Sequence, residues 1–99
     1  MSDKKELLAQ FFGGYFHEDW KLDAKSPSEV VDAYRKDFNS EQRLVLSKAI
    51  LEYSQSFCLD SELRSGLFHE LGCYYDPSAD GLSTRDWLQS VSSQLLKRP

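Results

Sequence analysis

The sequence has 99 residues, a net charge of −4 and an ordinary globular composition, with 40% hydrophobic and 28% charged residues. This length suits a single domain with one modest core, which we expect to span residues 1–99. No apolar run approaches the roughly 20 residues that cross a bilayer, and the charged N-terminus lacks a secretion signal, so we expect a cytoplasmic protein without a membrane partner.

The negative charge is concentrated in one part of the chain. Residues 1–48 carry nine acids and eight bases (−1), residues 49–86 carry seven acids and two bases (−5), and residues 87–99 carry two bases (+2). Nucleic acid is a poor partner for such a surface, because binding it requires neutralisation of phosphates. The charge favours a basic macromolecule as partner, or serves solubility alone.

Residues 11–20 (FFGGYFHEDW) hold five of the thirteen aromatic residues and are expected at the centre of the core. Before them, Leu7, Leu8, Phe11 and Phe12 recur at helical spacing. The pair of glycines at 13–14 is expected to end or bend this first helix. Residues 15–20 are read as a further short helical turn, and residues 21–25 as a loop. We assign a structural role to a set of residues in and beyond this segment: Gly14, Tyr15, Phe16, His17, Asp19, Trp20 and Trp87.

Three further helices have clear start signals. Ser26 followed by Pro27 and Glu29 is typical of a helix N-terminus, and Asn39 or Ser40 is expected to cap the next helix. Ser83 with Asp86 has capping-box spacing at the start of the last helix.

Between residues 57 and 83 the pattern predicts one more helix and a loop. Leu63, Leu67 and Leu71 mark the helix, which Gly72 is expected to terminate. Residues 73–81 are rich in turn-forming types. With no convincing strand pattern, the prediction is an all-α single compact domain of about five short helices.

No catalytic or metal-binding pattern is complete. His17-Glu18 and His69-Glu70 begin a zinc-binding HExxH motif, but the second histidine is replaced by lysine at position 21 and by cysteine at position 73. His17 and Asp19 are read instead as making local hydrogen bonds in the aromatic turn. We therefore expect no enzyme activity, no metal and no cofactor.

The two cysteines are expected in the core, whereas two adjacent tyrosines suit either an interface or the core. Cys58 and Cys73 fit no redox or zinc spacing and are expected as buried thiols. Tyr74 and Tyr75 lie in the acidic part of the chain, and tyrosine is enriched in protein interfaces. Each of them is about equally suited to folding back onto the core.

Residues 14–20 (GYFHEDW), preceded by Leu7-Leu8 and Phe11-Phe12, resemble the N-terminal signature of immunity proteins from contact-dependent growth inhibition systems. Residues 26–31 (SPSEVV) and 81–88 (GLSTRDWL) are similar to other recurring features of that family, whereas residues 39–72 match only as generic amphipathic helix.

The resemblance implies a bacterial cytoplasmic inhibitor that binds the toxin domain of a secreted adhesin, often a nuclease, with one inhibitor bound to each toxin domain. A nuclease presents a basic cleft shaped for phosphates, which an acidic surface can occupy. The residues expected to contact the toxin are Glu52, Asp60, Glu62, Glu70, Tyr74, Tyr75, Asp76 and Asp80. The alternatives are a generic acidic helical adaptor with no toxin partner, and a small enzyme or metal protein.

Overall fold

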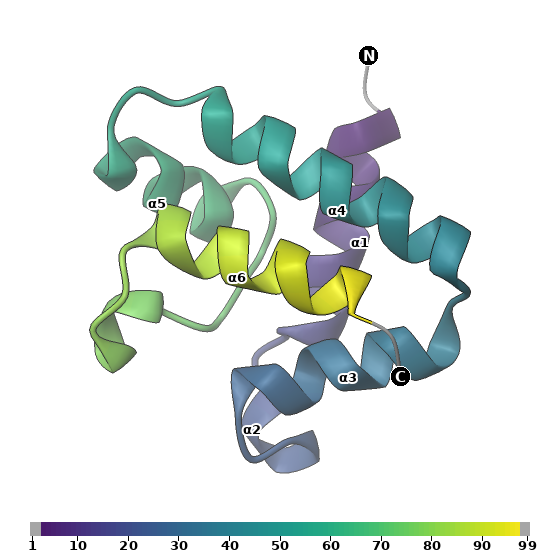
Figure 1. Ribbon diagram of the computed structural model, residues 1–99. Helices are drawn as coiled ribbons and strands as arrows, with labels where there is room; N and C mark the ends of the chain where they lie inside the picture. Colours follow the sequence, from purple (N-terminus) through teal and green to yellow (C-terminus); the bar gives the residue numbers. More distant parts are fainter. Residues whose placement is uncertain (1–2, 98–99) are drawn as a thin grey trace.

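The computed structural model describes residues 3–97, apart from the side chains of residues 3 and 23. In chain order its elements are α1 (Asp3–Tyr15), α2 (Trp20–Asp23), α3 (Pro27–Asp37), α4 (Ser40–Gln55), α5 (Asp60–His69), the 3-10 helix η1 (Pro77–Asp80) and α6 (Thr84–Leu96) (Figure 1). No strand occurs in this part of the chain. The all-α prediction is confirmed. None of these helices has the length and apolarity that spanning a bilayer demands.

The expected start signals operate as local hydrogen bonds. The Ser26 hydroxyl accepts the Glu29 N–H at the start of α3, with Pro27 in the first helical position. Asn39 and Gln42 form a reciprocal capping box at the start of α4. The Ser83 hydroxyl accepts the Asp86 N–H at the start of α6. Each cap satisfies N–H groups that the first turn of a helix leaves unpaired.

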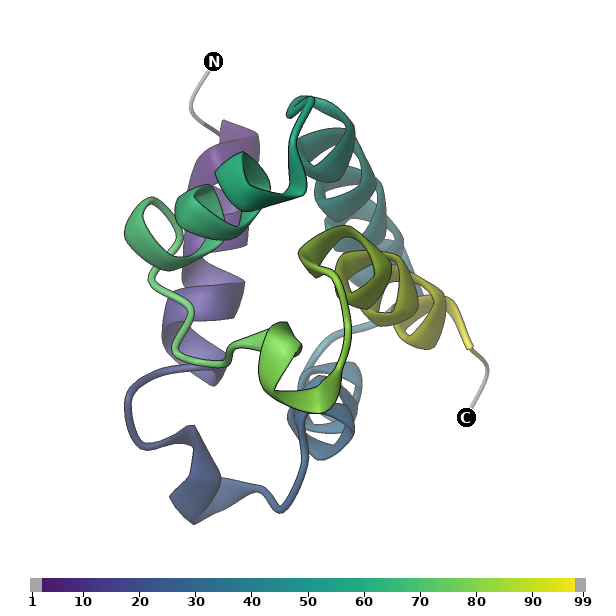
Figure 2. The same ribbon diagram turned by 90° about the vertical axis from the view of Figure 1, so that its left-hand side faces the viewer.

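Helices α4 and α6 lie side by side and run in opposite directions (Figures 1 and 2). Their approach is close because small residues meet at the crossing. The Ser47 hydroxyl donates to the Ser92 carbonyl oxygen at 3.3 Å, and the Ser92 hydroxyl donates to the Ser47 carbonyl oxygen at 3.4 Å. Both side chains are buried, so these bonds satisfy hydroxyl groups that would otherwise be costly to bury.

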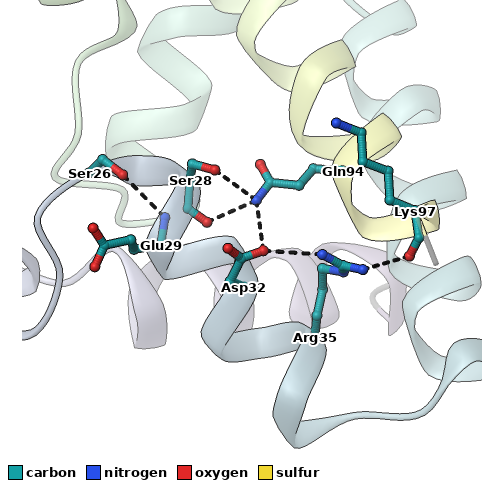
Figure 3. A network of polar contacts seen from close by, with 7 residues as sticks. All are labelled: Ser26, Ser28, Glu29, Asp32, Arg35, Gln94 and Lys97. Atoms are coloured by element: carbon teal, nitrogen blue, oxygen red, sulfur yellow. Dashed lines mark hydrogen bonds and ion pairs between the residues drawn. The ribbon is translucent and has the colours of Figure 1, made fainter. Parts of the chain in front are cut away.

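A polar network joins α3 to the C-terminal end of α6 (Figure 3). The Gln94 amide nitrogen donates to the Ser28 carbonyl oxygen at 2.9 Å and to Asp32 Oδ1 at 3.1 Å. Arg35 pairs with Asp32 and donates to the Lys97 carbonyl oxygen at 2.7 Å. A cation at the C-terminal end of a helix complements the unpaired carbonyl groups there, so Arg35 helps to terminate α6.

Three local expectations are wrong. Helix α1 continues through Gly13 and Gly14 to Tyr15 rather than ending at the glycines. Part of the expected loop 21–25 is helical, because α2 occupies Trp20–Asp23 and raises the number of α-helices to six. Among the cysteines, Cys73 is buried as expected but Cys58 is exposed.

The end of α5 also differs from the expectation. The helix ends at His69, three residues before Gly72. The chain then makes a wider turn, in which the N–H of Leu71 donates to Gly66 and that of Cys73 donates to Leu67. Gly72 has a φ of 72° in this turn, a backbone conformation that glycine adopts without steric cost.

Candidate functional site

The aromatic turn after α1 forms the centre of the core. Phe16 is fully buried, and its ring lies 5.2 Å from that of Trp87, 6.0 Å from Trp20 and 6.1 Å from Tyr75, measured between centroids. Trp20 and Tyr75 meet edge to face at 5.6 Å. Such offset and edge contacts are favourable beyond the area they bury. The core assignment of Trp20 and Trp87 is confirmed.

His17 shapes the turn through its imidazole ring and its backbone. Its Nδ1 accepts the Asp19 backbone N–H at 3.0 Å, and its carbonyl oxygen accepts the Trp20 N–H at 3.0 Å. These bonds confirm the reading of His17 as a residue that makes local hydrogen bonds in the turn; Asp19 takes part through its backbone. The chain is thereby directed into α2.

The segment after α5 presents one tyrosine to solvent and buries the other. The Tyr74 backbone N–H donates to the Phe16 carbonyl oxygen at 2.8 Å, which ties this segment to the aromatic turn. Cys73 and Tyr75 point inward, whereas Tyr74 is 63% exposed. The expectation that Tyr75 contacts the toxin is therefore wrong. Tyr75 is a core residue, because its ring completes the cluster around Phe16 and Trp87.

Asp76 is held by two groups of its own chain. Its carboxylate accepts from Arg64 Nη2 at 2.6 Å and Nε at 3.3 Å, and it caps η1 by accepting the Ser78 N–H at 3.0 Å. The Arg64 guanidinium, followed by Ser78, lowers the pKa of Asp76 to about 2. Asp76 is thus ionised, but part of its charge is neutralised within the chain.

Asp80 supports the buried tyrosine from the end of η1. Its carboxylate accepts a hydrogen bond from the Tyr75 hydroxyl, and burial together with this bond raises the pKa of Tyr75. Gly81 follows with a φ of 77°, which turns the chain toward α6. Asp80 remains exposed at the surface.

The other predicted contact acids have different surroundings. Asp60 accepts the backbone N–H groups of Thr84 and Arg85, at 3.0 and 2.8 Å, and so caps α6 from α5. Glu52 pairs with Lys4, and Glu70 pairs with Lys5 at 2.9 Å. Glu62 is exposed, and its side chain makes no hydrogen bond or ion pair with the described residues.

Most of the predicted toxin-contact residues lie on one continuous surface, and one of them, Glu52, lies elsewhere. The part of the chain from α5 through the following loop to η1 occupies one side of the molecule, which faces the viewer in Figure 2. We call this side the 60–80 face. It carries five exposed or half-buried acids and one exposed tyrosine: Asp60, Glu62, Glu70, Asp76, Asp80 and Tyr74. Glu52 lies outside it, on α4.

A groove of about 410 Å³ separates the end of this face from α2. Tyr74, Asp76 and Asp80 line one wall, and Lys21 and Lys25 line the other. The fold therefore brings Tyr74, Asp76 and Asp80 together at one wall. The two lysines opposite them were not predicted from the sequence to lie near these residues.

A second groove, of about 560 Å³, lies between the end of α1, α2 and α3. Three acids, Glu29, Asp32 and Asp37, line it against one lysine, Lys36, beside Gly14 and Tyr15. The Tyr15 hydroxyl donates to Asp37 Oδ2 at 2.8 Å. Burial, followed by this bond, raises the pKa of Tyr15 to about 12, so the hydroxyl stays protonated.

No pattern in the sequence predicts this second groove. The three acids belong to α3, in a part of the chain whose net charge is only −1, and the opposite walls come from the end of α1 and from α2, whose packing against α3 no local pattern shows. The available signal was their spacing: Glu29, Asp32 and Lys36, with Asp37 adjacent, recur at three- and four-residue intervals on one helix.

The 60–80 face and the two grooves present charged and aromatic side chains at the surface. Among the described residues, no three histidine, cysteine, aspartate or glutamate side chains gather closely enough to hold a metal ion. Charged and aromatic groups held on rigid elements are what recognition of another macromolecule requires.

Comparison with known proteins gives a family match and a structural likeness. A family model described as CdiI immunity protein matches residues 4–95. A chain in the crystal structure of the CdiA-CT/CdiI complex from Y. kristensenii 33638 superposes with a TM-score of 0.83 and 26% sequence identity, over 94% of this chain and 99% of that chain. No curated protein matches.

Proposed function

This chain belongs to the CdiI immunity protein family, and from that membership we propose that it binds the toxin domain of a contact-dependent growth inhibition system and neutralises it. The observation that carries the proposal is the family match over nearly the whole chain. The likeness to a chain crystallised in a CdiA-CT/CdiI complex supports it. The protein then acts as an inhibitor, in the bacterial cytoplasm, with one toxin domain bound per chain.

The toxin in this proposal is a nuclease that is blocked by charge and shape. A nuclease cleft is basic because it binds phosphates, and an acidic surface can be steered into it and exclude the substrate. The 60–80 face offers Glu62 and Asp80 as exposed carboxylates and Tyr74 as an exposed ring.

The other predicted contacts have weaker support. Glu52, Glu70 and Asp76 each pair with a cation of this chain, and Asp60 accepts two backbone N–H groups at the start of α6, which reduces the charge that they present to a toxin. Asp80, by contrast, accepts a hydrogen bond from the neutral Tyr75 hydroxyl. Glu52 also lies away from the 60–80 face. In the proposal these four residues contribute to the field of the surface rather than to direct anchoring.

The test is co-purification with the toxin domain encoded beside the gene for this chain, followed by a nuclease assay on RNA and DNA. We expect a stable complex in which the nuclease activity of the toxin is lost. A toxin domain that fails to bind would contradict the proposal and favour a generic adaptor. A bound toxin without nuclease activity would contradict only the nuclease assignment.

A further inference from the structure

Gly14 has no evident structural reason to be glycine. It lies in the last turn of α1 with ordinary helical φ, and a Cβ added to it would meet no atom within 4 Å. Glycine in a helix is unfavourable relative to alanine, because it loses more backbone freedom on folding. Gly13 beside it does have a reason, since its Cβ would lie 3.3 Å from the Leu71 carbonyl oxygen.

The open space at Gly14 belongs to the acidic groove between α1, α2 and α3. The missing Cβ leaves backbone exposed on the groove wall, where a bound group can approach the main chain closely. No contact within the described chain requires glycine at position 14. The close approach of an external group to the main chain would require it.

The charges of the groove indicate what that group is. Glu29, Asp32 and Asp37 line it against a single lysine, Lys36; His17, which also lines it, is engaged in the aromatic turn. Tyr15 holds Asp37 through one carboxylate oxygen, and the other oxygen can accept a further bond. Asp32 is bound at Oδ1 by Arg35 and Gln94, which likewise leaves Oδ2 to accept.

We infer that this groove is a second contact site for the toxin domain, in which a basic side chain of the toxin lies against Gly14 between the carboxylates of α3. This inference rests on the proposed function, because it takes the toxin domain as the partner. Trp20 lines both this groove and the one beside Tyr74, so one partner that covers α2 reaches both. Leu22, which is 83% exposed on α2, lies in the area that such a partner covers.

The first experiment measures affinity for the adjacent toxin domain, by calorimetry, together with thermal unfolding. Gly14→Ala and Gly14→Gln are expected to keep or raise the melting temperature, because both residues favour helix, yet to weaken binding about tenfold or more. Gly13→Ala is the matched control: it is expected to lower the melting temperature and leave the affinity of the folded protein unchanged.

The second experiment reverses charges on α3 in both directions. Glu29→Lys is expected to weaken binding and Lys36→Glu to strengthen it. Both should lower the melting temperature slightly and to a similar extent, because Glu29 lies in the first turn of α3 and Lys36 in its last turn, where each charge complements the helix dipole. A general loss of stability cannot make one variant bind more weakly and the other more tightly, because it would weaken binding in both.

The outcomes separate this inference from the proposed function. Tight binding by the parent protein with unchanged affinity in the Gly14 and α3 variants would overturn the groove and leave the proposed function standing. A lowered melting temperature in Gly14→Ala would also count against the inference, because glycine would then serve the fold. No binding by the parent protein would overturn both.

Discussion

The backbone N–H of Tyr74 donates a hydrogen bond to the carbonyl oxygen of Phe16, with 2.8 Å between nitrogen and oxygen. This bond joins the aromatic turn that fills the core to the loop of the 60–80 face. Because Tyr75 packs beside Phe16, the same contact points Tyr74 outward. The aromatic turn thus has two roles: it stabilises the fold, and it fixes how the loop presents Tyr74.

Substitutions at the two adjacent tyrosines are expected to separate stability from binding. Tyr75→Ala should lower the free energy of unfolding by about 3–5 kcal/mol, the usual cost of removing a buried aromatic ring. Tyr74→Ala should stay within about 0.5 kcal/mol of the parent protein, because its side chain is exposed. Chemical denaturation measures both values.

Binding by the same variants completes this test. Tyr74→Ala should weaken the affinity for the toxin domain, whereas Tyr74→Phe should largely retain it if the ring supplies the contact area. Equal affinity in the parent protein and Tyr74→Ala would remove Tyr74 from the proposed contact.

Gly66 allows α5 to approach α4. A Cβ on Gly66 would lie 2.3 Å from the Tyr53 hydroxyl and 3.2 Å from Phe57 Cζ. Gly66→Ala is therefore expected to destabilise the protein by about 1–3 kcal/mol through overpacking. Denaturant unfolding checks this value.

A double mutant identifies the cause of that loss. The Tyr53 hydroxyl donates to Glu70 at 2.9 Å, so Tyr53→Phe alone should cost a little stability. In combination with Gly66→Ala it also removes the nearest clashing atom, and the two losses should be less than additive. Strict additivity would show that the hydroxyl is not the obstacle.

The lowered pKa of Asp76 predicts that this residue contributes to the loss of folding stability in acid. Its pKa is lowered from 3.8 to about 2 by Arg64 and Ser78, so its contribution to stability is fully present above about pH 4. That contribution is lost as the pH falls through about 2, when the folded carboxylate becomes protonated. Asp76→Asn should therefore show a smaller loss of stability between pH 4 and pH 2 than the parent protein, as measured by thermal unfolding across that range.

Helix starts were predictable from sequence because their causes are local. Ser26, Asn39 and Ser83 each accept an N–H three residues further along the chain, and such spacings are visible without the fold. By contrast, α2 is a single turn, too short for apolar residues to recur at helical spacing.

Other features depended on contacts between distant segments. The Phe16–Tyr74 bond decides which of the two tyrosines is buried, and no local pattern contains it. The sequence predicts that Gly13 and Gly14 end or bend α1, whereas the helix continues through both and Gly14 borders an open groove. The acids of the 60–80 face were identified by composition, whereas the ion pairs of Glu70 with Lys5 and of Asp76 with Arg64 arise from packing.

The association rate constant for the toxin domain, measured by stopped-flow at low and at physiological salt, tests the central claim most directly. Glu62→Lys with Asp80→Lys reverses two exposed charges on the 60–80 face, and Glu41→Lys is the control at the far end of α4. We predict that the double variant associates about tenfold more slowly at low salt, with a smaller difference at physiological salt, while the control associates nearly as fast as the parent protein. Equal association rates for the parent protein and the folded double variant would contradict the account.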